Sequence, residues 1–119
     1  MWRVLHTSAA LYPSSPEPKR IAECASFVRG LPSIIPCDGC AKNLRSELAG
    51  RDEFLACASG ESLSQMWCEV HNAVNVRTSK PLVDCSQVQD MYAMPLLPSA
   101  ALGTEDRELH AVKSCVEFG

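Results

Sequence analysis

Residues 61–77 read ESLSQMWCEVHNAVNVR, and the periodicity of this stretch decides the fold. Successive residues of an α-helix advance by about 100°, so a helix here carries two neighbouring stripes. The first stripe is apolar and predicts a buried face: Leu63, Trp67, Val70 and Val74. The second stripe is polar: Cys68, His71, Asn72 and Asn75. A buried polar group without a partner costs about 1–3 kcal/mol, so we expect water or a hydrogen-bonding ligand to meet the second stripe.

The sequence Cys37-Asp38-Gly39-Cys40 adds a dithiol motif. Pro36 precedes a predicted helix that should run from about Cys37 to about Leu48. The positive end of the helix dipole then favours a thiolate, which is the form that attacks a disulfide or a flavin. A CxxC motif by itself also fits a zinc site or a structural disulfide.

The rest of the chain reads as short helices punctuated by proline and glycine, with no alternating pattern that predicts a strand. We expect helices at Trp2–Tyr12, from Pro16–Pro18 to Gly30, and at Ser86–Tyr92, and a loop at Gly50–Gly60. Five short helices with tight connections therefore indicate that the fold class is an all-α bundle. We expect one domain at residues 1–94 and a tail at residues 95–119, with a peripheral helix at Thr104–Lys113.

Composition narrows the classes of function. The chain has 119 residues and seven cysteines, more than packing requires, which indicates disulfide, metal or redox chemistry. The net charge is −3 and the basic residues are not clustered, so no nucleic-acid partner is expected. No apolar run approaches the roughly 20 residues of a membrane span, so no membrane partner is expected either.

Two cysteines lie outside these motifs. Cys24 recurs at helical spacing with Ile21, Ala25 and Val28, which favours a core thiol over a reactive one. Cys57 lies in the expected loop, where an exposed thiol is plausible.

Four motifs in order resemble the Erv/ALR family of FAD-linked sulfhydryl oxidases, over residues 2 to about 92. They are Trp2-x-x-Leu5-His6 with Ala9-Ala10-x-Tyr12-Pro13, Pro36-Cys37-x-x-Cys40-Ala41, Trp67-Cys68-x-x-His71-Asn72-x-Val74-Asn75, and Lys80-Pro81-x-x-Asp84-Cys85. The resemblance implies a four-helix bundle with a short fifth helix and FAD at the bundle mouth, usually as a homodimer. It also implies oxidation of protein dithiols with reduction of O2 to H2O2.

Site residues follow from the same resemblance. Cys37 and Cys40 become the redox disulfide, with Cys40 against the flavin and Cys37 forming the mixed disulfide with substrate. Cys68 and Cys85 become a structural disulfide. Lys80 supplies charge for the pyrophosphate, and Tyr92 stands where relatives have a tryptophan. The implied cofactor contacts are Trp2, His6, Tyr12, Cys68, His71, Asn72, Val74, Asn75, Lys80 and Tyr92.

Several alternatives remain open from the sequence. Cys115 is a possible shuttle that works with Cys57 or with a cysteine of a partner subunit, or else substrates reach Cys37 directly. A structural zinc module on Cys37, Cys40, Cys68 and His71 is the alternative function, although it leaves Asn72 and Asn75 unexplained. Disulfide-forming chemistry fits the mitochondrial intermembrane space, the secretory pathway, or host cytoplasm for a viral protein. The resemblance to cellular mitochondrial members favours the first.

Overall fold

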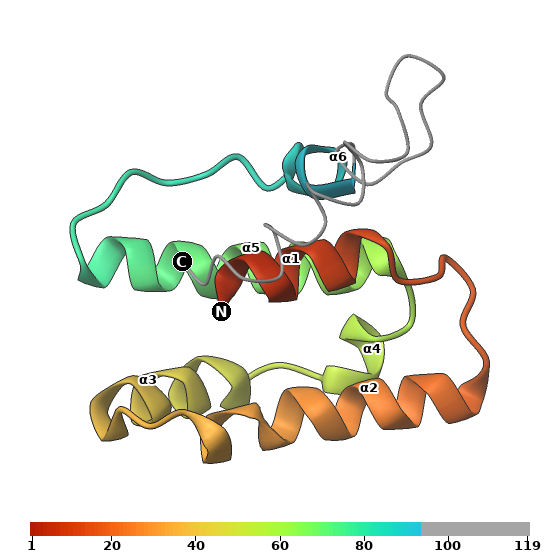
Figure 1. Cartoon of the computed structure of the whole chain (residues 1–119), viewed down its shortest axis with the longest axis horizontal. Helices are drawn as coiled ribbons and strands as arrows, with labels where there is room; N and C mark the ends of the chain where they lie inside the picture. The colour runs from red at the N-terminus through yellow and green to blue at the C-terminus, as the bar shows by residue number, and fades with distance from the viewer. Residues whose placement is uncertain (94–119) are drawn as a thin grey trace, which may run out of the picture.

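A computed structural model describes residues 1–93, and this part of the chain is helical without a β-strand. Figure 1 shows its elements in order along the chain. They are α1 (Trp2–Ala10), α2 (Pro18–Gly30), the 3-10 helix η1 (Leu31–Ile34), α3 (Asp38–Ala49), α4 (Glu53–Ala56), α5 (Gly60–Arg77) and α6 (Val88–Ala93). The predicted all-α class is confirmed. The expected tail, its helix at Thr104–Lys113 and Cys115 lie outside the described residues.

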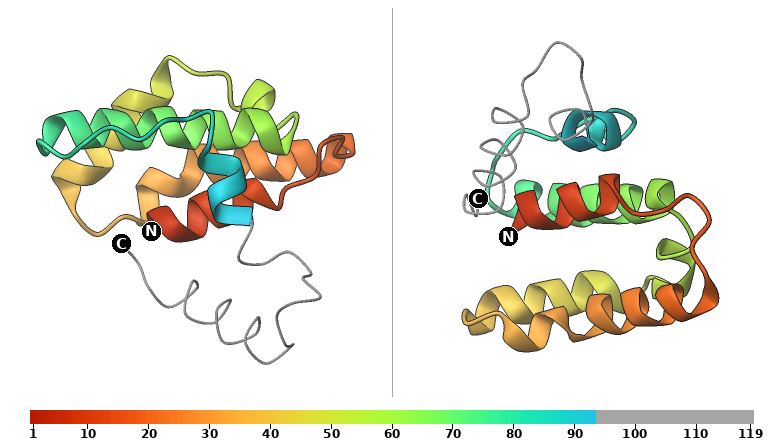
Figure 2. Two further views of the ribbon diagram at one scale, coloured as in Figure 1. Left: turned by 90° about the horizontal axis from the view of Figure 1, so that it is seen from above. Right: turned by 45° about the vertical axis from the view of Figure 1, so that its right-hand side comes forward.

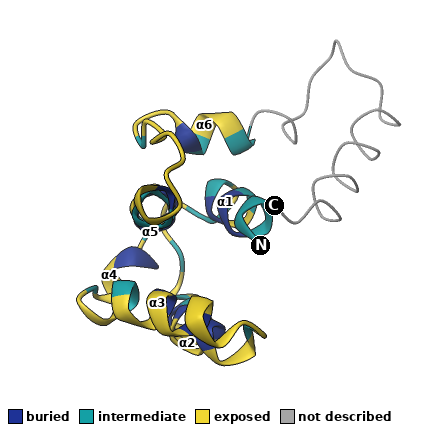
Figure 3. Ribbon diagram, turned by 90° about the vertical axis from the view of Figure 1, so that its left-hand side faces the viewer, coloured by how far each residue is buried: buried dark blue, intermediate teal, exposed yellow. Residues whose placement is uncertain are grey.

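The helices form three layers (Figure 2, right). α1 and α5 lie side by side in the middle layer, α6 crosses over them on one side, and α2 and α3 lie on the other. Buried residues gather where these helices face one another (Figure 3). Trp67 of α5 is one of the largest fully buried side chains and belongs to the same cluster as Leu5, Val28 and Val70. Leu63, Trp67 and Val70 of the apolar stripe are therefore core, as their spacing predicts, whereas Val74 is half-buried.

The start of α5 is fixed by local chemistry and by a close approach to α1. Ser59 caps the helix through the backbone N–H of Ser62, and the Ser62 hydroxyl accepts a hydrogen bond from the Ser59 N–H in return. The Gly60 N–H donates to the Pro13 carbonyl at 2.9 Å. A Cβ atom on Gly60 would lie 2.4 Å from the Tyr12 carbonyl oxygen, so only glycine allows this approach.

A disulfide between Cys24 and Cys57 ties α2 to the end of α4, with Cα atoms 5.9 Å apart. Two expectations were therefore wrong: Cys24 is not a lone core thiol, and Cys57 is fully buried and oxidised rather than exposed. The expected loop contains α4, whose first turn is capped by Asp52, and this short helix turns Cys57 toward α2. Cys57 is bonded to Cys24 and so has no free thiol with which to partner Cys115.

No helix within residues 1–93 is both long enough and apolar enough to cross a membrane.

Candidate active site

Cys37 and Cys40 lie at the N-terminus of α3, both exposed and both free thiols. Cys37 is the N-cap residue, and its Sγ accepts a hydrogen bond from the backbone N–H of Cys40 at 3.3 Å. Hydrogen bonds from the Cys40 thiol and from this N–H lower the pKa of Cys37. The same thiol–thiol hydrogen bond raises the pKa of Cys40. The first proton lost by the pair therefore leaves a thiolate on Cys37.

The two thiols border different surroundings. Cys40 lines a pocket of about 240 Å³ between α3, the N-terminus of α1 and the C-terminal end of α5, whereas Cys37 is not part of its lining. The lining is mostly apolar: Met1, Trp2, Ile35, Cys40, Asn43, Leu44, Val74, Arg77 and Thr78. A larger pocket of about 300 Å³ between α2, α3 and α5 contains none of the predicted site residues. Proximity to the dithiol singles out the first pocket.

Trp2 connects this pocket to a stack of aromatic rings from three helices. Its indole lies parallel to the His71 imidazole, with ring centroids 4.1 Å apart and planes within 5°. His6 Nε2 is hydrogen-bonded to His71 Nδ1 at 2.9 Å, and the His6 ring stacks on Tyr92 at 4.7 Å. The structure therefore brings together four predicted contacts that lie far apart in the sequence.

Both imidazoles of this stack are kept neutral. Burial lowers the pKa of His6 to about 4, with a smaller contribution from His71. Burial and the charge of Lys80 lower the pKa of His71. His6 is 3% exposed, and its Nδ1 atom has no hydrogen-bond partner. Flat neutral ring faces and one unpartnered ring nitrogen suit a flat, partly polar cofactor.

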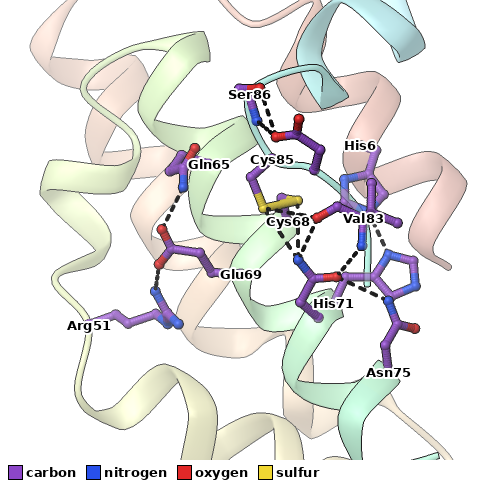
Figure 4. Close-up of a disulfide and its surroundings, with 12 residues drawn as sticks. His6, Arg51, Gln65, Cys68, Glu69, His71, Asn75, Val83, Cys85 and Ser86 are labelled. Atoms are coloured by element: carbon purple, nitrogen blue, oxygen red, sulfur yellow. Dashed lines mark hydrogen bonds and ion pairs between the residues drawn. A yellow bond between two sulfur atoms is a disulfide. The ribbon is translucent and has the colours of Figure 1, made fainter. Parts of the chain in front are cut away.

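The segment after α5 returns over the polar stripe, so that Val83 and Cys85 lie near Cys68 and His71 (Figure 4). Asn72 holds this segment in place. The Asn72 amide donates to the Val83 carbonyl at 2.8 Å, and its oxygen accepts from the Val83 N–H at 2.9 Å. The Asn75 amide donates to the same oxygen at 3.2 Å. The structure also contains the Cys68–Cys85 disulfide that the resemblance implied. Asn72 thus acts as a clamp within the chain, and its contact with a cofactor stays a prediction.

Not every predicted contact lies beside the stack. The Tyr12 hydroxyl donates to the Cys57 carbonyl at 2.8 Å, and the Arg20 guanidinium lies over the Tyr12 ring. The structure therefore uses Tyr12 at the junction of α1 with the end of α4. Val74 lines the Cys40 pocket, and Lys80 is near enough to His71 to shift its pKa.

Sequence reasoning missed several residues of the Cys40 pocket. Asn43 and Leu44 lie three and four residues after Cys40, so the helical repeat places them on the face of Cys40 and could have identified them. Arg77 reaches across to α3, where its guanidinium donates to Glu47 at 2.9 Å. That contact depends on how α5 crosses α3, and helical periodicity contains no signal for it.

The zinc alternative was wrong. The Cys68 sulfur is bonded to Cys85, so it cannot serve as a thiolate ligand together with Cys37, Cys40 and His71. Within residues 1–93 there is also no group of three or more histidine, cysteine or acidic side chains placed to hold a metal ion.

Known proteins are similar to this chain in both sequence and fold. The model of the Erv1 / Alr family matches residues 1–93, and the chain belongs to this family. It is 38% identical over 84 residues to the mitochondrial FAD-linked sulfhydryl oxidase erv1 of Schizosaccharomyces pombe, covering 71% of this chain and 46% of that protein. A putative FAD-linked sulfhydryl oxidase of Invertebrate iridescent virus 3 is 27% identical over 109 residues, covering 92% and 74%.

A solved structure supports the same assignment. The crystal structure of the FAD binding domain of Erv1 from Saccharomyces cerevisiae superimposes with a TM-score of 0.71 at 32% identity, covering 76% of this chain and 85% of that one. The chain spans less than half the length of the Erv1 relatives from Schizosaccharomyces pombe, Saccharomyces cerevisiae and two plants that it matches.

Proposed function

We propose that this chain is an FAD-linked sulfhydryl oxidase, which oxidises protein dithiols to disulfides and reduces O2 to H2O2. The observation that carries the proposal is the position of Cys40. One thiol of an exposed pair borders an apolar pocket, and the Trp2 ring of that pocket belongs to the stack of neutral rings. The names of the relatives agree with this reading.

The residues present fit FAD. The pocket beside Cys40 is apolar and bordered by Trp2 and Val74, which suits a flat ring system. The unpartnered Nδ1 of buried His6 offers a hydrogen-bonding position, and Lys80 places a positive charge near His71. When bound, FAD would accept the electron pair of the reduced dithiol and pass it to O2.

The protein's own part is thiol–disulfide exchange. A substrate thiolate attacks Cys37 Sγ of the oxidised pair, a mixed disulfide forms, and Cys40 leaves as a thiolate. A second substrate thiolate then attacks the substrate sulfur of the mixed disulfide and releases Cys37. The substrate leaves oxidised, and the pair has gained two electrons. Cys37 suits the outer position because it is exposed and does not line the pocket, whereas Cys40 does.

Assembly and location are further parts of the proposal. We propose a homodimer with an oxidase domain at residues 1–94 and a tail at residues 95–119, and a mitochondrial location in the intermembrane space. The name of the Schizosaccharomyces pombe relative supports the mitochondrial location. The viral relative keeps host cytoplasm as the alternative. Relay by Cys115, through a cysteine of the partner subunit, also stays a proposal.

The test is an absorption spectrum of the purified protein, with metal analysis and oxygen uptake on the same sample. We expect flavin bands near one per chain and oxygen consumption when dithiothreitol is added. Cys37→Ser and Cys40→Ser should each abolish turnover without loss of flavin. A colourless protein that consumes no oxygen, even after incubation with FAD, would refute the oxidase assignment.

A further inference from the structure

Ile34 lies three residues before Cys37 and is 74% exposed, more than any other large apolar side chain among residues 1–93. Single exposed apolar residues are common on protein surfaces, so exposure alone has no meaning. The position of Ile34 is what calls for an explanation. It presents a large apolar group three residues from the thiol that receives substrate in the proposed reaction.

The local backbone fixes Ile34 in this position. Ile34 ends η1, whose first two residues, Leu31 and Pro32, are buried. The next residue, Ile35, lines the Cys40 pocket, and Pro36 restricts the backbone directly before Cys37. The chain is therefore anchored on both sides of Ile34, whose own side chain is left in solvent.

The distance from Ile34 to Cys37 sets what can touch both. Three residues span at most about 10 Å, which is the reach of two or three residues on either side of a cysteine in a partner polypeptide. A partner thiol that attacks Cys37 comes from solvent, because Cys37 is exposed and does not line the pocket that Cys40 borders. A neighbouring apolar side chain of the partner then lies within reach of Ile34.

We propose that Ile34 selects thiol proteins in which a large apolar side chain lies within two or three residues of the attacking cysteine. The inference rests on the proposed function, because it assigns Cys37 as the position that substrate attacks. Burial of an isoleucine side chain against such a residue should favour the apolar partner by about tenfold. A small dithiol is too short to reach Ile34 and gains nothing from it.

The test measures exchange at Cys37 without FAD or turnover. The full chain with Cys40→Ser and Cys115→Ser carries thionitrobenzoate on Cys37 as a mixed disulfide. A single-cysteine peptide thiolate attacks Cys37 Sγ, a new S–S bond forms, and thionitrobenzoate leaves as a coloured thiolate. Two peptides are compared that differ only in leucine or glutamine two residues from the cysteine.

We expect the leucine peptide to react about ten times faster than the glutamine peptide, and Ile34→Ser to remove that ratio. Leu55→Ser is the matched control, since Leu55 is 70% exposed but lies in α4, away from the dithiol. The rate of the glutamine peptide should stay the same in all variants, which shows that Cys37 itself is unaltered. The inference is overturned if Ile34→Ser keeps the ratio, or if Leu55→Ser lowers it equally.

The two proposals have separate readouts, so their failures can be told apart. Oxygen uptake with dithiothreitol tests the oxidase activity, and the peptide ratio tests the docking residue. Failure of turnover with an intact, Ile34-dependent ratio would refute the first and support the second.

Discussion

Removing the Cys24–Cys57 disulfide should destabilise the protein strongly without touching the dithiol chemistry. A cross-link restricts the unfolded chain, and its effect grows with the length of the closed loop. The two cysteines are 33 residues apart, which corresponds to about 3.7 kcal/mol in the chain-entropy model. The Cys68–Cys85 disulfide closes 17 residues, corresponding to about 3.1 kcal/mol. Against a total stability of about 5–15 kcal/mol, either loss is large.

The variant to use is Cys24→Ala with Cys57→Ala, because either single substitution would leave an unpaired thiol at the other position. Equilibrium unfolding in urea, followed by circular dichroism, gives the free energy of unfolding. We expect a decrease of about 4 kcal/mol, the cross-link term plus a small cavity at Cys57. The matched control is Cys37→Ala with Cys40→Ala, which also removes two cysteines but from an exposed pair.

The control should change the free energy of unfolding by less than about 1 kcal/mol. Treating the wild-type protein with a reductant under unfolding conditions removes both disulfides, so it should lower the free energy of unfolding further, by about 7 kcal/mol in the chain-entropy model. A decrease below about 1 kcal/mol in the Cys24/Cys57 variant would show that the unfolded chain is already restricted, or that the bond is strained, and would refute the reasoning.

Three further predictions follow from single side chains. The folded pKa of His6 is about 4 and its ordinary value is 6.5, so the unfolded state binds more protons between these values. The free energy of unfolding should be at its full value above about pH 6.5 and should fall by up to about 3 kcal/mol toward pH 4. Measured by urea unfolding between pH 6.5 and 5, the free energy of unfolding should change less steeply with pH in His6→Asn, and an unchanged pH dependence would contradict this origin. Gly60→Ala should cost about 2 kcal/mol through its clash with Tyr12, whereas Gly50→Ala, with open space around it, should be neutral in the same assay. Iodoacetamide should modify Cys37 of the reduced protein at lower pH than Cys40. Cys40→Ala should shift the pH dependence of Cys37 modification to higher pH. Mass spectrometry that shows Cys40 modified first would contradict this order.

The helices were predictable because their signals are local. The expected helix over Glu61–Arg77 is observed as Gly60–Arg77, and that over Cys37–Leu48 as Asp38–Ala49. In both, a capping side chain or a proline lies within a few residues of the start, so short-range chemistry decides the boundary.

The Cys24–Cys57 pairing could not be predicted for the opposite reason. Each cysteine has a reasonable local interpretation, one on a helix face and one in a loop. Their meeting depends on α4 packing against α2, and the four residues of α4 are too few to show a helical period. The position of Tyr12 has the same origin, since its partner is the carbonyl of that same Cys57.

The polar side chains of α5 find most of their hydrogen-bond partners within the chain itself. From the sequence, its amides and its imidazole were expected to meet water or a hydrogen-bonding ligand. In the structure, Val83 satisfies Asn72, the Asn72 oxygen satisfies the amide of Asn75, and His6 satisfies one nitrogen of His71. The Cys68–Cys85 disulfide makes this possible because it holds the following segment against the helix.

The polar group that still needs a hydrogen-bond partner therefore lies on α1 and not on α5. The buried atom of the stack that has no hydrogen-bond partner is Nδ1 of His6. The periodicity of α5 gives no indication of this atom, because His6 lies in α1. The neighbouring pocket beside Cys40 also requires contributions from α1, α3 and α5 together. A cofactor that occupies this pocket and bonds to His6 Nδ1 would complete the site. The sequence indicates some of its residues one by one, but only the packing of the three helices brings them together.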